Sequence, residues 1–152
     1  MTTYYARSFK DLRVYQKAHE VSRAVFRLSK AFPKEEMYSL TDQIRRAVRS
    51  VGAQIAEAWG KRRYEKHFVS KLTDADAEQM ETQHWVGEAL DCGYVSAADA
   101  TQLNSDLEEI GRMLNSMMEK AEAFCGPLNS ALHETTVEYF TAPDDPPLNT
   151  DP

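Results

Sequence analysis

Apolar residues recur at alternating intervals of four and three positions in four separate stretches of the chain. This period is typical of a helix that packs lengthwise against other helices. The clearest stretch covers residues 40–59, and its apolar positions share one side of a helix: Ile44, Val48, Val51, Ile55 and Ala58. Gly52 and the alanines around it would let a neighbouring helix approach closely. The pattern therefore predicts a helix with one face in a core, capped by Ser39 or Thr41.

A second stripe precedes this helix and predicts another long one. Ser8 is a suitable N-cap, and Asp11 is placed to complete a capping box with it. Pro33 ends the helix, because a proline disfavours helical geometry in the residue before it. The apolar face consists of Val14, Ala18, Val21, Val25, Leu28 and Phe32. We interpret the charged residues between them as a solvated surface.

The remaining two stripes predict a third and a fourth helix. The third stripe consists of Tyr64, Phe68, Leu72, Ala75, Gln79, Thr82, Val86 and Ala89. Gly93 is expected to end this helix in the left-handed conformation, and Ser96 is expected to cap the next one. The fourth stripe consists of Leu103, Leu107, Ile110, Leu114, Met117, Ala121 and Phe124.

Four long helices with short connections predict an all-α fold, namely an antiparallel up-down-up-down four-helix bundle. We place this bundle at residues 8–125 and a flexible arm at residues 1–7. Residues 126–152 form a C-terminal tail that we expect to be mostly disordered, because it is rich in proline and aspartate.

The composition of the 152 residues indicates a single domain without a membrane-spanning segment. No apolar run approaches about 20 residues, and the polar start lacks the apolar core of a signal peptide. The two cysteines, Cys92 and Cys125, do not make a disulfide framework. We therefore expect a cytoplasmic protein that does not bind membranes, with each thiol buried or half-buried in a structural role.

Positive charge is concentrated in one region of an otherwise acidic chain. The whole sequence has a net charge of −6, yet residues 44–71 hold eight cations and two acids. Such segregation suits contact with the phosphates of RNA or DNA, and Tyr64, His67 and Phe68 could stack on unpaired bases. The residues predicted to bind nucleic acid are Arg45, Arg46, Arg49, Lys61, Arg62, Arg63 and Lys66.

The alternative is that these basic residues bind acidic side chains of another subunit, while Tyr64 and Phe68 lie in the core. Polar residues on a helix stripe often face a subunit interface or a buried hydrogen-bond network. Glu57 could pair with an arginine of a neighbouring chain, or with Lys61 one turn along its own helix. We assign the oligomer interface to Gln54, Glu57, Gln79 and Thr82.

The sequence does not favour an enzyme. Glu81 and His84 have the spacing used in di-iron bundles, but such a site needs a second pair and two further carboxylates. The spacing suggests no nucleophile with its base, and there is no phosphate-binding glycine loop. We therefore expect no catalytic residue, no metal site and no cofactor.

A further signal lies in seven short segments, which are residues 9–18, 32–36, 38–47, 50–51, 54–57, 81–83 and 90–94. The match is densest over residues 40–57, which begin Leu40-Thr41-Asp42-Gln43-Ile44-Arg45-Arg46-Ala47. Together these segments resemble the intervening-sequence protein family, which bacteria encode within large-subunit ribosomal RNA genes. The chain departs from the usual family pattern at Gln54, Ala58, Asp76 and Gln79, where the family tends to have asparagine, glycine, serine and glutamate.

The resemblance implies a left-handed four-helix bundle that assembles into a ring, a homopentamer, and that has no catalytic activity. A related branch comprises accessory factors of the reverse transcriptases in diversity-generating retroelements, which bind nucleic acid and the polymerase. The molecular role of the family at large is poorly defined. Nucleic-acid contact and subunit contact therefore both stay open for the basic residues.

Overall fold

The computed structural model describes residues 6–126, and every structural statement below concerns this part of the chain. Helices account for most of it. The four long ones are α1 (Arg13–Ser29), α2 (Leu40–Gly60), α3 (Glu65–Asp91) and α4 (Ala97–Glu119). The short elements are the 3-10 turns η1 (Phe9–Asp11) and η2 (Lys34–Glu36) and the single helical turn α5 (Ala121–Phe124). The expected all-α fold with four long helices is confirmed.

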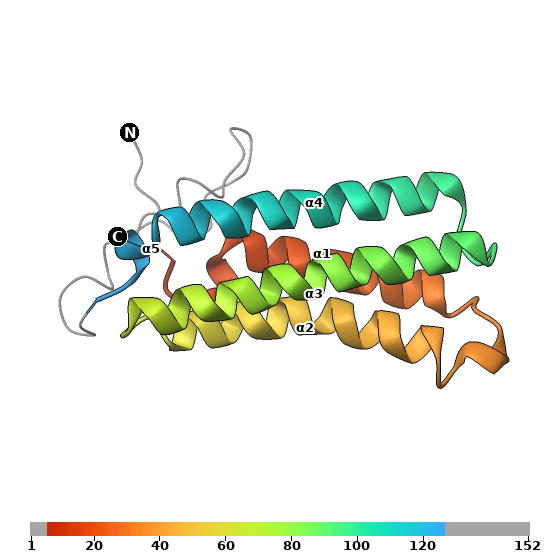
Figure 1. Ribbon diagram of the computed structural model, residues 1–152, viewed down its shortest axis with the longest axis horizontal. Coiled ribbons are helices and arrows are strands. Elements are labelled where there is room, and N and C mark those ends of the chain that lie inside the picture. The colour runs from red at the N-terminus through yellow and green to blue at the C-terminus, as the bar shows by residue number, and fades with distance from the viewer. Residues whose placement is uncertain (1–5, 127–152) are drawn as a thin grey trace.

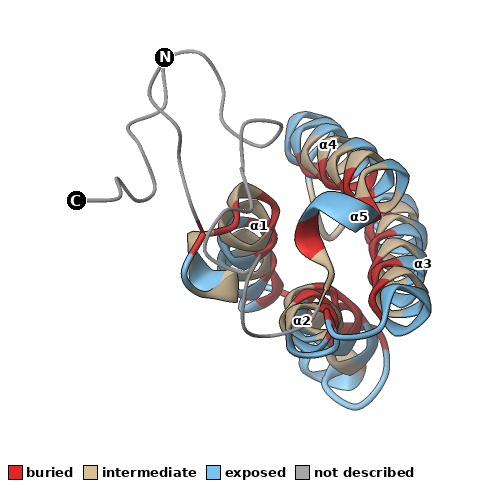
Figure 2. Ribbon diagram, turned by 90° about the vertical axis from the view of Figure 1, so that its left-hand side faces the viewer, coloured by how far each residue is buried: buried red, intermediate tan, exposed pale blue. Residues whose placement is uncertain are grey.

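Consecutive helices run in opposite directions, as the colour gradient of Figure 1 shows. Viewed along the bundle, the helices surround a common centre, with α3 across from α1 (Figure 2). Each helix packs against the two beside it: α2 lies against α1 and α3, and α4 lies against α3 and α1. The short links of the sequence produce this arrangement, because they leave each helix only an antiparallel neighbour.

The predicted apolar stripes form the core, and Figure 2 shows the buried residues facing the bundle centre. All five stripe residues of α2 are at most 2% exposed, and the stripe of α4 continues without a break into α5. Two predicted core residues differ. Leu28 is half-buried, and Tyr64 is 59% exposed because it precedes the first turn of α3 and leaves the helical face there.

The helix ends agree with the sequence at three points and differ at three. One difference is that α1 ends at Ser29, four residues before Pro33, so Phe32 packs on the core from the link after the helix. Ser8 and Asp11 form the predicted capping box, Ser96 accepts from the Asp99 N–H, and Gly93 has a φ of 76°. The capping box begins η1, however, and α1 starts only after Leu12, which is extended. At the start of α2 neither expected cap acts, and Glu36 Oε2 accepts from the Leu40 N–H at 3.0 Å.

The boundaries of the predicted arm and tail need a small change. Ala6 is 3% exposed, and the Arg7 N–H donates to Asp11 Oδ2 at 2.8 Å, so residues 6 and 7 pack on the bundle. At the other end the Gly126 N–H donates to the Arg62 carbonyl at 3.2 Å. The rest of the arm (1–5) and of the tail (127–152) lies outside the described residues.

The two cysteines differ in environment. Cys92 is exposed, contrary to the expectation of a buried or half-buried thiol, because it follows the last turn of α3 at the surface. Cys125 is half-buried, and burial, with a smaller effect of the Glu65 carboxylate, raises the pKa of its thiol to about 11. Within residues 6–126, no helix combines the length and apolar character needed to cross a bilayer.

Gly52 of α2 faces the Tyr15 ring of α1. A Cβ atom built on Gly52 would lie 3.6 Å from Tyr15 Cε2, which is an ordinary van der Waals contact. We therefore expect Gly52→Ala to raise the free energy of unfolding by about 0.5–1 kcal/mol, because alanine costs less backbone entropy in a helix. Urea unfolding followed by circular dichroism measures this change, and a destabilised variant would contradict the expectation.

Candidate nucleic-acid interface

The seven cations predicted to bind nucleic acid do not share one surface. Arg45, Arg46 and Arg49 lie in the first half of α2, whereas Lys61 and the basic residues after it follow the opposite end of that helix. At 1.5 Å of rise per residue, Arg45 and Lys61 are about 24 Å apart along α2. The basic stretch of the sequence therefore forms two separate basic surfaces, one at each end of α2.

The first place is an aromatic ring surrounded by cations from two helices, which we call the Phe26 cluster (Phe26, Lys30, Arg45 and Arg49). Lys30 Nζ lies 4.8 Å from the Phe26 ring centroid, Arg45 Cζ 4.7 Å and Arg49 Cζ 5.6 Å. Phe26 itself is 36% exposed. The negative face of the ring attracts cations and offsets part of their mutual repulsion, which lets three of them gather here.

Hydrogen bonds hold one arginine of the Phe26 cluster in place. Arg45 Nε donates to Ser29 Oγ at 2.7 Å, and the Ser29 hydroxyl donates to the Phe26 carbonyl at 3.1 Å. Arg49 is exposed. In the described part of the chain, Lys30, Arg45 and Arg49 form no ion pair with a carboxylate. Their charge is therefore available to an external anion.

Sequence reasoning missed the contribution of α1 to this cluster. We interpreted the charged face of α1 as a solvated surface, and we assigned no role to Phe26 or Lys30. One signal was available, namely that Phe26 lies off the apolar stripe of α1, next to Val25 on it. A large aromatic residue on the outer face of an amphipathic helix is a candidate contact residue.

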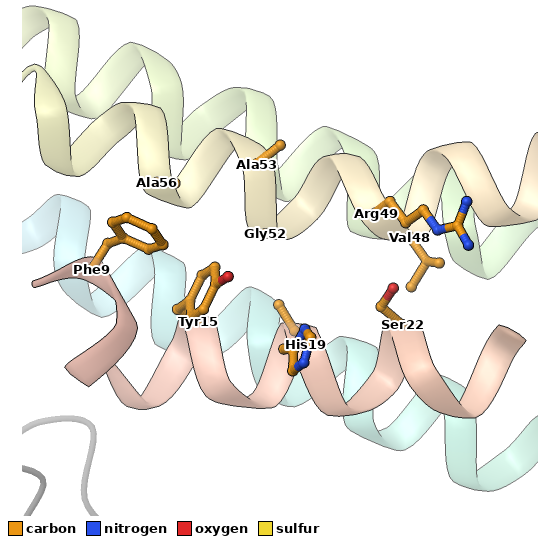
Figure 3. Close-up of a pocket in the computed structure, with 10 residues that line it drawn as sticks. Phe9, Tyr15, His19, Ser22, Val48, Arg49, Gly52, Ala53 and Ala56 are labelled. Carbon is orange, nitrogen blue, oxygen red and sulfur yellow. The ribbon is translucent and has the colours of Figure 1, made fainter.

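A groove between α1 and α2 continues from the Phe26 cluster and has a volume of about 420 Å³. Arg49 belongs to both, since it lines the groove and covers Phe26. Phe9 and Tyr15 lie at one end of the groove and Ser22 and Arg49 at the other (Figure 3). The α2 wall of the groove has small residues, Gly52, Ala53 and Ala56, and the α1 wall has rings.

The rings of the α1 wall are arranged in a row. The centroids of Phe9 and Tyr15 are 4.9 Å apart in an edge-to-face contact, and those of Tyr15 and His19 are 6.3 Å apart with nearly parallel planes. Tyr15 is half-buried and His19 is exposed. The groove thus offers aromatic surface next to positive charge.

The second basic place is the turn between α2 and α3, where Lys61, Arg63 and Lys66 are exposed. The rings of Tyr64 and His67 lie beside them with centroids 5.4 Å apart, and both residues are exposed. This turn has the aromatic and cationic residues that we predicted, except for Phe68, which is fully buried.

Arg62 does not belong to either basic surface, contrary to the prediction. It is 8% exposed, its Cζ lies 3.3 Å from the Trp59 ring centroid, and its Nε donates to the Trp59 carbonyl at 2.7 Å. Burial lowers the pKa of its guanidinium to about 10. Because its side chain packs on Trp59 inside the bundle end, Arg62 is not positioned to contact a phosphate outside it.

The fold also separates charge between its two halves. Helix α1 has four cations and one acid, and α2 has three cations and two acids. By contrast, α3 has seven acids and two cations, and α4 has five acids and one cation. On α3, burial and the neighbouring Glu81 and Asp74 raise the pKa of Glu78. The Phe26 cluster and the groove therefore lie on the basic half of an acidic protein.

Comparison with known proteins identifies the family. The model of the 23S rRNA-intervening sequence protein family matches residues 10–116. The chain belongs to this family. It is also similar to the crystal structure of a protein of unknown function from the S23 ribosomal protein family of Bacteroides thetaiotaomicron, with 27% sequence identity and a TM-score of 0.64. That match covers 70% of this chain and 98% of the other. No curated protein matches the chain.

Two of the residues that we assigned to an oligomer interface are buried inside the bundle. Gln79 is 3% exposed and Thr82 is fully buried. Gln79 Nε2 donates to Asp76 Oδ1 at 2.9 Å, and its Oε1 accepts from Gln83 Nε2 at 2.7 Å. The Thr82 hydroxyl donates to the Glu78 carbonyl at 2.8 Å. Gln79 is thus held by two half-buried neighbours on its own helix and Thr82 by the helix backbone, and neither reaches the surface of the bundle.

The other two assigned interface residues are partnered within the chain. Lys71 of α3 lies 2.9 Å from Glu57 Oε2 and donates to Gln54 Oε1 at 3.3 Å. This lysine lowers the pKa of the Glu57 carboxyl through its hydrogen bond and its charge. We had expected a partner on a neighbouring chain or Lys61. In the structure Glu57 and Gln54 instead join α2 to α3.

Glu81 and His84, which have the spacing found in di-iron bundles, lie on α3. The His84 ring packs edge-to-face on Trp85 with centroids 4.6 Å apart. Among residues 6–126, no group of three histidine, cysteine, aspartate or glutamate side chains is arranged to hold a metal ion.

Proposed function

We propose that this protein is a non-enzymatic, oligomeric four-helix bundle that contacts RNA or DNA through the α1–α2 face. The observation that supports this most is the Phe26 cluster, where three cations from two helices converge on one exposed ring. Cations next to aromatic surface are the usual elements of nucleic-acid contact without sequence specificity. The family name refers to an intervening sequence of 23S rRNA and not to a ligand, so RNA and DNA are both to be tested.

Replacement of Arg49 should measure how much the α1–α2 face contributes. We expect Arg49→Gln to weaken binding of a labelled RNA severalfold at low salt, and the slope of log K against log salt to fall by about 0.7–0.9. The double variant Lys30→Gln/Arg49→Gln should lose about twice that slope. Fluorescence anisotropy over a series of salt concentrations gives both quantities.

The matched control is Arg112→Gln, which removes an exposed helical arginine from the acidic helix α4. We expect this variant to bind like the unmodified protein. If Arg49→Gln and Arg112→Gln weaken binding equally, the binding reflects non-specific electrostatic attraction to the whole protein and not a contact at the α1–α2 face. If the unmodified protein binds no RNA and no DNA at low salt, the proposed function is wrong.

The charge separation supports a second candidate, in which the cations serve subunit contacts. The basic α1–α2 half of one copy would pack against the acidic α3–α4 half of the next. Repetition of such a head-to-tail contact closes a ring, and we propose the homopentamer that the family resemblance implies. In this case Lys30→Gln/Arg49→Gln dissociates the oligomer in light scattering, whereas the first proposal predicts an intact oligomer with weaker RNA binding.

A further inference from the structure

We propose that the groove between α1 and α2 takes an unpaired base of a single-stranded nucleic acid, whose phosphates lie on the Phe26 cluster. This inference rests on the proposed function and adds which form of nucleic acid binds and where its base lies. It is based on the shape of the groove, the rings in its wall and the position of the cations at its end.

The shape of the groove suits a flat, apolar ligand. Its volume of about 420 Å³ is in the range of small-molecule pockets. Opposite the rings of α1, the α2 wall consists of Gly52, Ala53 and Ala56, whose side chains are no longer than a methyl group, and Val48 and Arg49 of α2 line the other end of the groove. Tyr15 faces this wall from α1, as Figure 3 shows. Because Tyr15 already lies against Gly52, a planar ring would lie beside it, over the exposed His19 and Ala53 that line the same groove.

The aromatic residues supply stacking surface for a base. Tyr15 and His19 have nearly parallel rings, and His19 is exposed to an incoming ligand. Phe9 supports Tyr15 from the other side through an edge-to-face contact. Bases stack on such rings with little sequence preference, because every base has an aromatic face.

The cations lie where the strand would leave the groove. Arg49 lines the groove and also covers Phe26, so a base in the groove places its phosphate near Arg49 and the next phosphates near Arg45 and Lys30. A base within a duplex is stacked and paired and cannot enter a groove of this kind. The arrangement thus favours a single strand over a duplex of equal charge.

A strand with abasic sites tests the inference most directly, because it keeps the phosphates and removes the bases. We expect the protein to bind a thymidine single strand about tenfold or more tightly than an abasic strand of the same length, given the usual contribution of one stacked base. Fluorescence anisotropy at one salt concentration measures both Kd values.

Two variants test whether the preference for a strand with bases arises in the groove. Ala53→Leu places a larger side chain in the groove from an exposed helical position, and His19→Ala removes an exposed ring. We expect Ala53→Leu to abolish the preference for the strand with bases, and His19→Ala to reduce it. The matched control is Ala77→Leu, the same exchange at an exposed position of α3, which should keep the preference.

The outcomes separate the two proposals. Equal binding of the thymidine and abasic strands overturns the base-in-groove inference and leaves the proposed phosphate contact standing. A preference that persists in Ala53→Leu also overturns it, because the base then lies elsewhere. If neither strand nor a duplex binds at low salt, the proposed function itself fails.

Discussion

Phe68→Ala is expected to lower the free energy of unfolding by about 3–5 kcal/mol, the usual cost of removing a buried phenylalanine. Phe68 is fully buried, and its ring stacks on Phe124 of α5 with centroids 5.7 Å apart. The ring joins the first turn of α3 to the end of the described chain. Its removal leaves a cavity between these elements that neither helix can fill without moving.

The control for this variant is Tyr64→Ala, one helical turn earlier. Both aromatic residues lie on the predicted stripe of α3, but Tyr64 is 59% exposed. We expect Tyr64→Ala to change stability by no more than about 0.5 kcal/mol, as for most surface substitutions. Urea unfolding of both variants measures the difference, and equal losses would show that the two rings are buried alike in solution.

Gly111→Ala is expected to lower the free energy of unfolding by about 1–2 kcal/mol, opposite in sign to Gly52→Ala. A Cβ atom on Gly111 would lie 2.9 Å from Gln79 Nε2 and 3.3 Å from Asp76 Oδ1. The new methyl group must displace the buried amide of Gln79 from its bond to Asp76. Disturbing a buried hydrogen bond costs about 1–3 kcal/mol, which exceeds the gain of up to about 1 kcal/mol in helix propensity.

The two glycine variants are best measured together by urea unfolding. Each replaces a helical glycine with alanine, so the intrinsic change in the helix is the same. The difference between them reports the packing at each site. A stable Gly111→Ala variant would mean that the Gln79 side chain can move without losing its hydrogen bonds.

The helical stripes could be predicted because a helix buries its residues at a regular interval. The same rule failed at Tyr64, since a residue just before a helix does not follow the helical period. It also could not decide the role of Gln79 and Thr82. Spacing places both residues on the inner face, but whether a second subunit or the same chain satisfies them depends on what packs there.

The candidate site was less predictable than the fold. Arg49 and Arg45 were identified from the charge of their segment, whereas Lys30 and Phe26 were not, because they belong to another helix. Arg62 was assigned to the surface on charge alone. Its burial follows from the stacking on Trp59 at the end of α2, a contact between near neighbours that the basic run of residues conceals.

The four helices, their order and the faces that they bury can be predicted from the sequence, because they follow from local spacing and short connections. Which charges share a surface depends on how the helices pack. Helix α2 is a rod that keeps Arg45 and Lys61 about 24 Å apart, although they are close in the sequence. Packing of α1 on α2 brings Phe26 and Lys30 to Arg45 and forms the groove beside them.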